Sequence, residues 1–453
     1  MYIYNYLLKN TIRYKALATL VILMLSVSIG VLSSLYSEVF LYLSISLFSF
    51  LVVLFLLITK TESSITFLAY LLLISLFFIP GFSLGGIGLR LDDVITIFLT
   101  LFILISIYKK SNDMYSPINK TIFAYTSYVI SITIIGVFLD NLPSFLIFYS
   151  IKEVQYFVYF FSFIFVMKNK WNRDNFNKIF MCLSLLTMAW GGYQLLFDAS
   201  VGFYGIGLIS ETSSSQSGGV FFLISIFFLY LINSEYKFKK RVVYFILFLG
   251  SIGMLFATIS RTAILAFAIS YVIYLGFTIF RMSTKRIIIS VYTLTLVAPV
   301  LYLILKGYLE RILFRISHID TGANVREEKW SYLLSHGTNF DFLFGGGRGF
   351  AQTITGGTTL SVDSQYVRNI LEVGYIGSAL FITVIIAIVI FALRNIKKHY
   401  AESLFLILIT CGFLVMSVTH EVFLVTIQAS FFWTLIGAFV GKVIYDNKLL
   451  RHL

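Results

Sequence analysis

Long apolar runs separated by short polar segments recur along the whole chain of 453 residues. A helix needs about 20 mainly apolar residues to span a bilayer, within a range of about 17 to 25. On that criterion the pattern predicts about 14 spans, with 12 or 13 as the alternative because the third, fourth, eighth and ninth runs are short or interrupted. The predicted spans lie near residues 16–35, 39–58, 64–80, 93–108, 118–139, 145–167, 177–197, 218–234, 241–257, 263–280, 286–305, 369–393, 401–418 and 422–444.

The longest stretch that breaks this pattern covers residues 306–365. It divides the chain into a transmembrane bundle of about 11 spans over residues 1–305, a large extracytoplasmic loop, and about three further spans over residues 366–453. The expected fold is therefore all-α, a polytopic integral membrane protein whose one large loop contains short amphipathic helices. One such helix is predicted over residues 324–334, with Asn324 as its N-cap.

Composition supports the membrane class. Hydrophobic residues make up 59% of the chain and charged residues 12%, about half the share that is usual in soluble proteins. The net charge of +13 is explained by cytoplasmic loops better than by a nucleic-acid partner. With both termini in the cytoplasm, the predicted inner segments hold 24 of the 34 Lys and Arg residues. This asymmetry places the large loop outside.

A single cation stands in the brief polar break before the tenth span. Arg261 follows Ser260 there and begins a helix at the outer membrane boundary. A guanidinium near hydrocarbon is costly and usually has an anionic partner. The N-terminus of a helix offers unpaired N–H groups to the same anion. An interior Asp or Glu and a bound phosphate are both consistent with this pattern.

The large loop carries further cations and a tryptophan. Arg311 and Arg315 follow the eleventh span one helical turn apart, and Arg326 and Trp330 share a face of the amphipathic helix. Each has a simpler interpretation, because arginines can anchor to lipid phosphates and a tryptophan can anchor a helix at the membrane interface.

Four other places contain polar residues in unusual settings. The Gly-rich segment 345–349 contains Arg348 but lacks the Lys-Ser/Thr ending of a nucleotide-binding loop, so a tight turn is expected. Asp363-Ser-Gln-Tyr366 precedes the twelfth span. The adjacent Lys152 and Glu153 of the sixth span point to different sides, so each needs its own partner. His420-Glu421 lies in a very short outer turn, which favours a capping or surface role.

The sequence contains no recognisable metal centre. His318 and His336 lack carboxylate or Cys companions at ligand spacing. Cys182 and Cys411 both lie in apolar stretches, so neither a disulfide framework nor a Cys-based metal site is expected. We therefore expect neither a metal nor another cofactor.

Three motifs, taken in order, resemble those of the superfamily of O-antigen ligases and Wzy-type O-antigen or capsule polymerases. They are Ser260-Arg261 before a helix, Arg326-Glu-Glu-Lys-Trp330 followed by Leu343-Phe-Gly-Gly-Gly-Arg-Gly349, and the segment 363–377 with its Glu-x-Gly-x-x-Gly ending.

The sequence departs from the ligases in two places. The first departure favours the polymerase branch, and the second leaves open which cations bind the phosphate. In the ligases the last motif opens with His-Asn and that His is the proposed base, whereas Asp363-Ser364 stand here. The ligases also carry an Arg in the outer loop before the eighth span, where residues 198–217 have none. Arg311, Arg315 or Arg348 could substitute for it.

The resemblance implies a metal-independent membrane glycosyltransferase at the outer face of the bacterial inner membrane. A polymerase of this kind transfers the growing glycan from undecaprenyl diphosphate to a hydroxyl of the next lipid-linked repeat unit. Its implied partners are lipid-linked repeat units, membrane lipid and a protein that regulates chain length. The alternatives are an O-antigen ligase, which transfers the glycan to lipid A-core, and a flippase or other transporter, which would favour internal repeats and mid-bilayer polar residues.

Within that interpretation each candidate residue has a role. Asp363 is the expected general base, and Arg261 and Arg326 are expected to clamp the diphosphate, because guanidinium groups pair bidentately with phosphate oxygens. The remaining candidates are expected to bind substrate: Arg315, Arg311, Arg348, Trp330 and Tyr366.

Overall fold

The structure is a computed structural model that describes residues 61–78, 82–84, 87–89, 91–109, 117–139, 147–197, 206–208, 214–279, 319–354, 362–423 and 426–451. The predicted spans 16–35, 39–58 and 286–305 lie outside these residues, as do Arg311 and Arg315.

Every other predicted span coincides with a helix. These helices are α3 (Thr61–Phe78), α4 (Leu91–Lys109), α5 (Pro117–Leu139), α6 (Ile147–Val166), α7 (Lys170–Phe197), α9 (Ser214–Ser234), α10 (Phe238–Ala257), α11 (Arg261–Ile279), α16 (Gln365–Asn395), α17 (Tyr400–Met416) and α18 (Thr426–Arg451). Within the described residues, seven helices are long and apolar enough to cross a membrane. The protein is thus an α-helical, multi-pass membrane protein, and the total of 14 spans stays a prediction.

Two helices form the centre of the bundle. Most of α9 and α18 is buried, and Trp433 of α18 packs against Phe157 of α6 with ring centroids 4.7 Å apart. Helix α18 approaches α6 closely because Gly437 carries no side chain: a Cβ atom there would lie 2.3 Å from the Phe160 carbonyl oxygen. Close approach of backbones at small residues is typical of helix packing in membranes.

The outer helices present apolar side chains to their surroundings. Leu196 of α7 is 78% exposed, Ile246 of α10 61% and Val272 of α11 67%. Exposure of large apolar side chains on several neighbouring helices is uncommon on soluble monomers. Lipid contact accounts for it.

A small β-hairpin departs from the all-α expectation. Strands β1 (Phe82–Leu84) and β2 (Ile87–Leu89) pair antiparallel between α3 and α4, with Phe82 opposite Leu89. Three-residue strands are too short to show an alternating pattern in the sequence. The intervening Gly85-Gly86 is the local signal that favours a hairpin.

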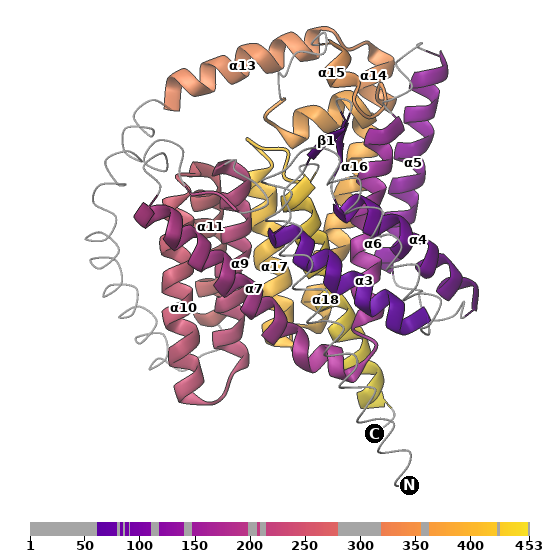
Figure 1. Ribbon diagram of the computed structural model, residues 1–453. Coiled ribbons are helices and arrows are strands. Elements are labelled where there is room, and N and C mark those ends of the chain that lie inside the picture. The colour runs from indigo at the N-terminus through magenta and orange to yellow at the C-terminus, as the bar shows by residue number, and fades with distance from the viewer. Residues whose placement is uncertain are drawn as a thin grey trace.

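Three short helices of the large loop gather at one end of the bundle, which we call the loop end (Figure 1). They are α13 (Ile319–Ser335), α14 (Asn339–Phe344) and α15 (Phe350–Ile354). Helix α13 lies crosswise to the long helices, and α18 ends at the opposite end (Figure 1). Helix α13 starts at Ile319, so the prediction that Asn324 caps it is wrong. An Asn inside a helix is less favourable than Ala by under about 1 kcal/mol. An Asn can therefore lie within a helix, and it does not by itself mark where the helix begins.

The Gly-rich turn joins the loop to a kink in α16. Gly374 has φ 65° and interrupts the helix, which leaves carbonyl groups of the preceding turn without helical partners. The Gly346 N–H donates to the Leu371 carbonyl and the Gly347 N–H to the Glu372 carbonyl, both at 2.9 Å. A Cβ atom on Gly374 would lie 2.5 Å from the Leu343 carbonyl oxygen. The turn and the kink therefore pack directly against each other. The tight turn expected at residues 345–349 is confirmed.

Candidate functional site

The turn between α10 and α11 sets the position of Arg261. Ile259 has φ 56°, a left-handed conformation that is strained for a β-branched residue. The Ser260 side chain packs against α9 at Gly218, where a Cβ atom would lie 2.5 Å from the Ser260 Cβ. Arg261 is the first residue of α11. The turn thus places a guanidinium at the N-terminus of a helix, as the sequence predicted.

Helix α13 is fastened to the segment that precedes α16. The Trp330 indole N–H donates to the Val362 carbonyl at 2.8 Å, and the ammonium of Lys329 lies 3.5 Å from the Asp363 carboxylate. One turn further on, Leu333 is buried in a small apolar cluster with Val362 and Leu371. These contacts fix the face of α13 that also carries Arg326.

Asp363 sits directly before α16 in a left-handed backbone conformation, with φ 54°. Ser364 caps the helix by accepting from the Val367 N–H at 3.5 Å. The left-handed conformation is uncommon outside glycine, although Asp and Asn adopt it more readily than most residues. This left-handed residue stands two positions before the first residue of α16.

The turn between α17 and α18 lies against the same segment. The Gln365 N–H donates to the Ser417 carbonyl at 3.0 Å, and the Val362 N–H donates to the Glu421 carboxylate at 3.1 Å. Each bond comes from a residue close to Asp363 in the chain, and each ends on a residue close to His420. The two bonds therefore bring this turn alongside Asp363.

His420 is the residue around which the predicted site gathers. Burial lowers the pKa of its imidazole from 6.5 to about 4, and the positive charges of Arg326 and Arg261 act in the same direction, while the negative charge of Asp363 opposes them. All three residues expected to be catalytic thus lie close enough to act on one side chain. His420 is neutral at pH 7 because its pKa is so far below that value.

His420 itself was not among the expected site residues. The sequence interpretation favoured a capping or surface role for His420-Glu421, and Glu421 does accept the Val362 N–H. The only signal in the sequence was the occurrence of two titratable residues in a very short turn.

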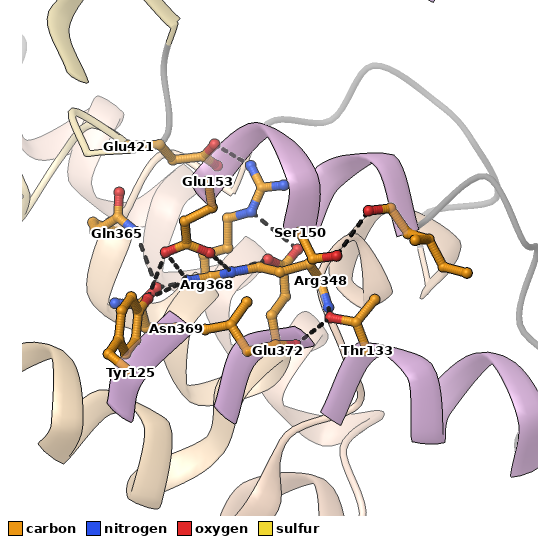
Figure 2. A network of polar contacts seen from close by, with 12 residues as sticks. Tyr125, Thr133, Ser150, Glu153, Arg348, Gln365, Arg368, Asn369, Glu372 and Glu421 are labelled. Carbon is orange, nitrogen blue, oxygen red and sulfur yellow. Dashed lines mark hydrogen bonds and ion pairs between the residues drawn. The ribbon is translucent and has the colours of Figure 1, made fainter. Parts of the chain in front are cut away.

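Arg348 is placed differently, in a buried network (Figure 2). Its side chain is 1% exposed and contacts the carboxylates of Glu153 and Glu372. The remaining guanidinium donors reach Asn369 at 3.1 Å and the Tyr125 hydroxyl at 2.7 Å. All of its N–H groups are therefore used within the protein. This placement favours a structural role over the substrate-binding role expected from the sequence.

The network continues to the turn that carries His420. Arg368 of α16 pairs with Glu372 at 3.0 Å and also with Glu421 (Figure 2). The expectation that Lys152 and Glu153 have separate partners is met, since Lys152 lies 3.8 Å from Asp93 whereas Glu153 pairs with Arg348.

Tyr366 is partly engaged by the protein. Its hydroxyl donates to the Leu414 carbonyl of α17 at 3.0 Å, and 38% of the residue is exposed. Among the described residues, no group of three or more His, Cys, Asp and Glu side chains could hold a metal ion. The side chains that act on His420 supply two guanidinium groups and a carboxylate beside its neutral imidazole.

No protein-family model matches this sequence, and a search of curated proteins finds no match either. The resemblance to polymerases and ligases therefore rests on the motifs of this chain and on their placement.

Proposed function

We propose that this protein is a glycan polymerase of the bacterial cytoplasmic membrane. It transfers a growing O-antigen or capsular polysaccharide from undecaprenyl diphosphate to a hydroxyl of the next lipid-linked repeat unit, at the outer face. The observation that carries the proposal is that the charges of Arg261, Arg326 and Asp363 all act on His420, whose turn is hydrogen-bonded to the segment around Asp363. The three charged residues come from three segments far apart in the sequence, at the loop end of a membrane bundle.

The reaction needs two kinds of group. The acceptor oxygen attacks the anomeric carbon, the bond from that carbon to the diphosphate oxygen breaks, and its electron pair leaves with undecaprenyl diphosphate. Arg261 and Arg326 stabilise this negative charge, since a guanidinium keeps its proton and matches phosphate geometry. Asp363 takes the proton from the acceptor hydroxyl. Neither role requires a metal ion.

The position of the loop end favours an acceptor and a donor that both reside in the membrane. Arg261 begins α11, and α16 begins just after Asp363, so both residues lie where apolar helices start. A polyprenyl tail can remain in lipid while its diphosphate reaches these residues. A protein that regulates chain length would meet the polymerase at the same face.

The ligase is the second candidate, and His420 is the observation that favours it. The ligase resemblance expects a histidine at the position of Asp363, and this chain brings His420 alongside Asp363 from another turn. The two functions use the same donor and differ in the acceptor, which is a second lipid-linked unit for the polymerase and lipid A-core for the ligase.

The test is reconstitution of the purified protein in lipid nanodiscs with undecaprenyl-diphosphate-linked repeat units and no ATP. We expect a ladder of polymers together with released undecaprenyl diphosphate. Asp363→Asn should lower turnover by about 10²- to 10⁴-fold, with normal abundance because Asn tolerates the left-handed conformation of this position.

The matched control is Asp174→Asn, which removes an exposed carboxylate at the start of α7 and should leave turnover unchanged. Product that forms only on lipid A-core would replace the polymerase by the ligase. Wild-type turnover in Asp363→Asn would remove Asp363 from the proposed mechanism.

A further inference from the structure

The hydrogen bonds around His420 give it a defined place beside Asp363. Ser417 and Glu421, which flank His420 in the turn, bond to Gln365 and Val362, which flank Asp363. The turn and the start of α16 are thus joined on both sides of the two titratable residues. These bonds fix the backbone of the turn that carries His420 beside the start of α16.

The charges that face His420 come from each element packed around it. Arg326 of α13 and Arg261 of α11 are positive, and Asp363 before α16 is negative. The Asp363 carboxylate is itself 3.5 Å from the ammonium of Lys329. The field that His420 experiences is therefore positive on balance.

The neighbouring carboxylate does not reverse this balance. Glu421 is engaged by the Val362 N–H and by Arg368, so its charge is already matched within the protein. The cluster around His420 thus combines an imidazole kept neutral with cations suited to bind an anion. Any anion that enters must change the proton affinity of the imidazole.

We propose that His420 takes up a proton when the diphosphate of the donor binds between Arg261 and Arg326, and so becomes a third cation of the diphosphate site. This inference rests on the proposed function, and it names a residue to complete the set of cations. Two negative charges on the diphosphate offset the arginine charges and attract an imidazolium directly. Asp363 lies close enough to stabilise the same imidazolium.

The proton then has a use in the reaction. As the bond between the anomeric carbon and the diphosphate breaks, the electron pair moves to the diphosphate oxygen. The imidazolium N–H donates its proton to that oxygen, so His420 returns to the neutral form. Asp363 meanwhile holds the proton of the acceptor hydroxyl and releases it to water. One proton enters with the donor and one leaves after transfer, so the protein returns to its starting state.

The binding of a diphosphate without a sugar tests this linkage directly. A suitable probe is farnesyl methyl diphosphate, a diester whose phosphates do not titrate near neutral pH, unlike a phosphate monoester, whose second pKa is about 6. Titration calorimetry of the full-length protein, in two buffers of different ionisation enthalpy, counts the protons taken up on binding.

A return of the His420 pKa from about 4 to its ordinary value near 6.5 predicts uptake of roughly 0.75 proton at about pH 6. The sign follows because the ligand binds more tightly to the protonated form: affinity rises as the pH falls below the pKa of the bound state. Binding should be about fourfold tighter at about pH 6 than at about pH 8.

Two variants separate His420 from other histidines. His420→Gln should bind the probe with the wild-type affinity found at about pH 8, at every pH, and without proton uptake, because glutamine stays neutral. His336→Gln is the matched control, since His336 is exposed at the end of α13, and it should keep the wild-type uptake.

The outcomes distinguish the inference from the function on which it rests. Binding of the probe by the wild-type protein without proton uptake would overturn the role of His420 and leave the polymerase proposal intact. Proton uptake that persists in His420→Gln would overturn it as well. A wild-type protein that does not bind the probe would remove the diphosphate site itself.

Discussion

Two groups of arginines and carboxylates lie at the loop end, and they differ in their balance of charge. In the network around Arg348, two arginines meet three glutamates, all within hydrogen-bonding distance. Around His420, the charges of Arg261 and Arg326 outweigh that of Asp363. Each charged group of the first network has an ion-pair partner among the described residues. The charges that act on His420 give it a positive field, which suits an anion.

The difference shows why the role of an arginine near a membrane, structural or ligand-binding, cannot be assigned from its residue type alone. Arg348 and Arg261 both stand in short polar segments next to apolar helices. Burial of a charge is costly unless the protein supplies a partner. Arg348 has its partners in Glu153 and Glu372, so its role is to join α6, α16 and the Gly-rich turn.

The largest effect, on stability, is expected when the network around Arg348 loses that arginine. Arg348→Ala leaves Glu153 buried without its cation and leaves Glu372 with Arg368 alone. Loss of one partner of a buried pair typically costs about 3–5 kcal/mol. We expect a large fall in the free energy of unfolding and in the yield of folded protein, measured by thermal unfolding in detergent.

Arg394→Ala is the control for this substitution, because Arg394 is exposed near the end of α16, and it should unfold as the wild type does. If Arg348→Ala were as stable as the wild type but inactive, Arg348 would belong to the substrate site and the distinction between the two groups would fail.

A smaller effect, on turnover rather than stability, is expected in the cluster around His420. Removing one donor that stabilises a developing negative charge costs about 10²- to 10³-fold in turnover, and we expect this loss for Arg261→Ala. Arg261→Lys should restore only part of the activity, because an ammonium group lacks the bidentate geometry of a guanidinium. The measurement is polymer formation per folded protein in nanodiscs.

Arg394→Ala again serves as the control and should polymerise at the wild-type rate. Loss of stability in Arg261→Ala as large as that in Arg348→Ala would show that Arg261 is a structural residue. Wild-type turnover in Arg261→Ala would exclude it from the diphosphate site.

The sequence predicted the helices well because an apolar run of about 20 residues is a strong signal. The predicted spans 118–139 and 369–393 differ by only a few residues from α5 and α16. The hairpin at Phe82–Leu89 was missed because strands of three residues produce no periodic pattern. The kink at Gly374 depends on its fit to the Gly-rich turn, which no local rule contains.

The candidate site combines residues chosen from the sequence with one that was not. Arg261, Arg326 and Asp363 were selected from motifs, and the structure brings their charges together at His420. His420 was missed because a single histidine in a short turn carries no pattern of its own. The need of Glu153 for a partner could be predicted from its place in an apolar span. The sequence could not show that this partner is Arg348, from the Gly-rich turn of the large loop.

The smallest effect is expected at the contact that holds α13 against Asp363. Trp330→Phe keeps an aromatic ring but removes the indole N–H that donates to the Val362 carbonyl. One such hydrogen bond is worth about 0.5–1.5 kcal/mol. If it places α13 beside Asp363, turnover should fall by about two- to tenfold, with a similarly small loss of stability. Equal turnover of Trp330→Phe and the wild type would favour the simpler interpretation, in which the ring only anchors α13 at the membrane interface, because phenylalanine also partitions there.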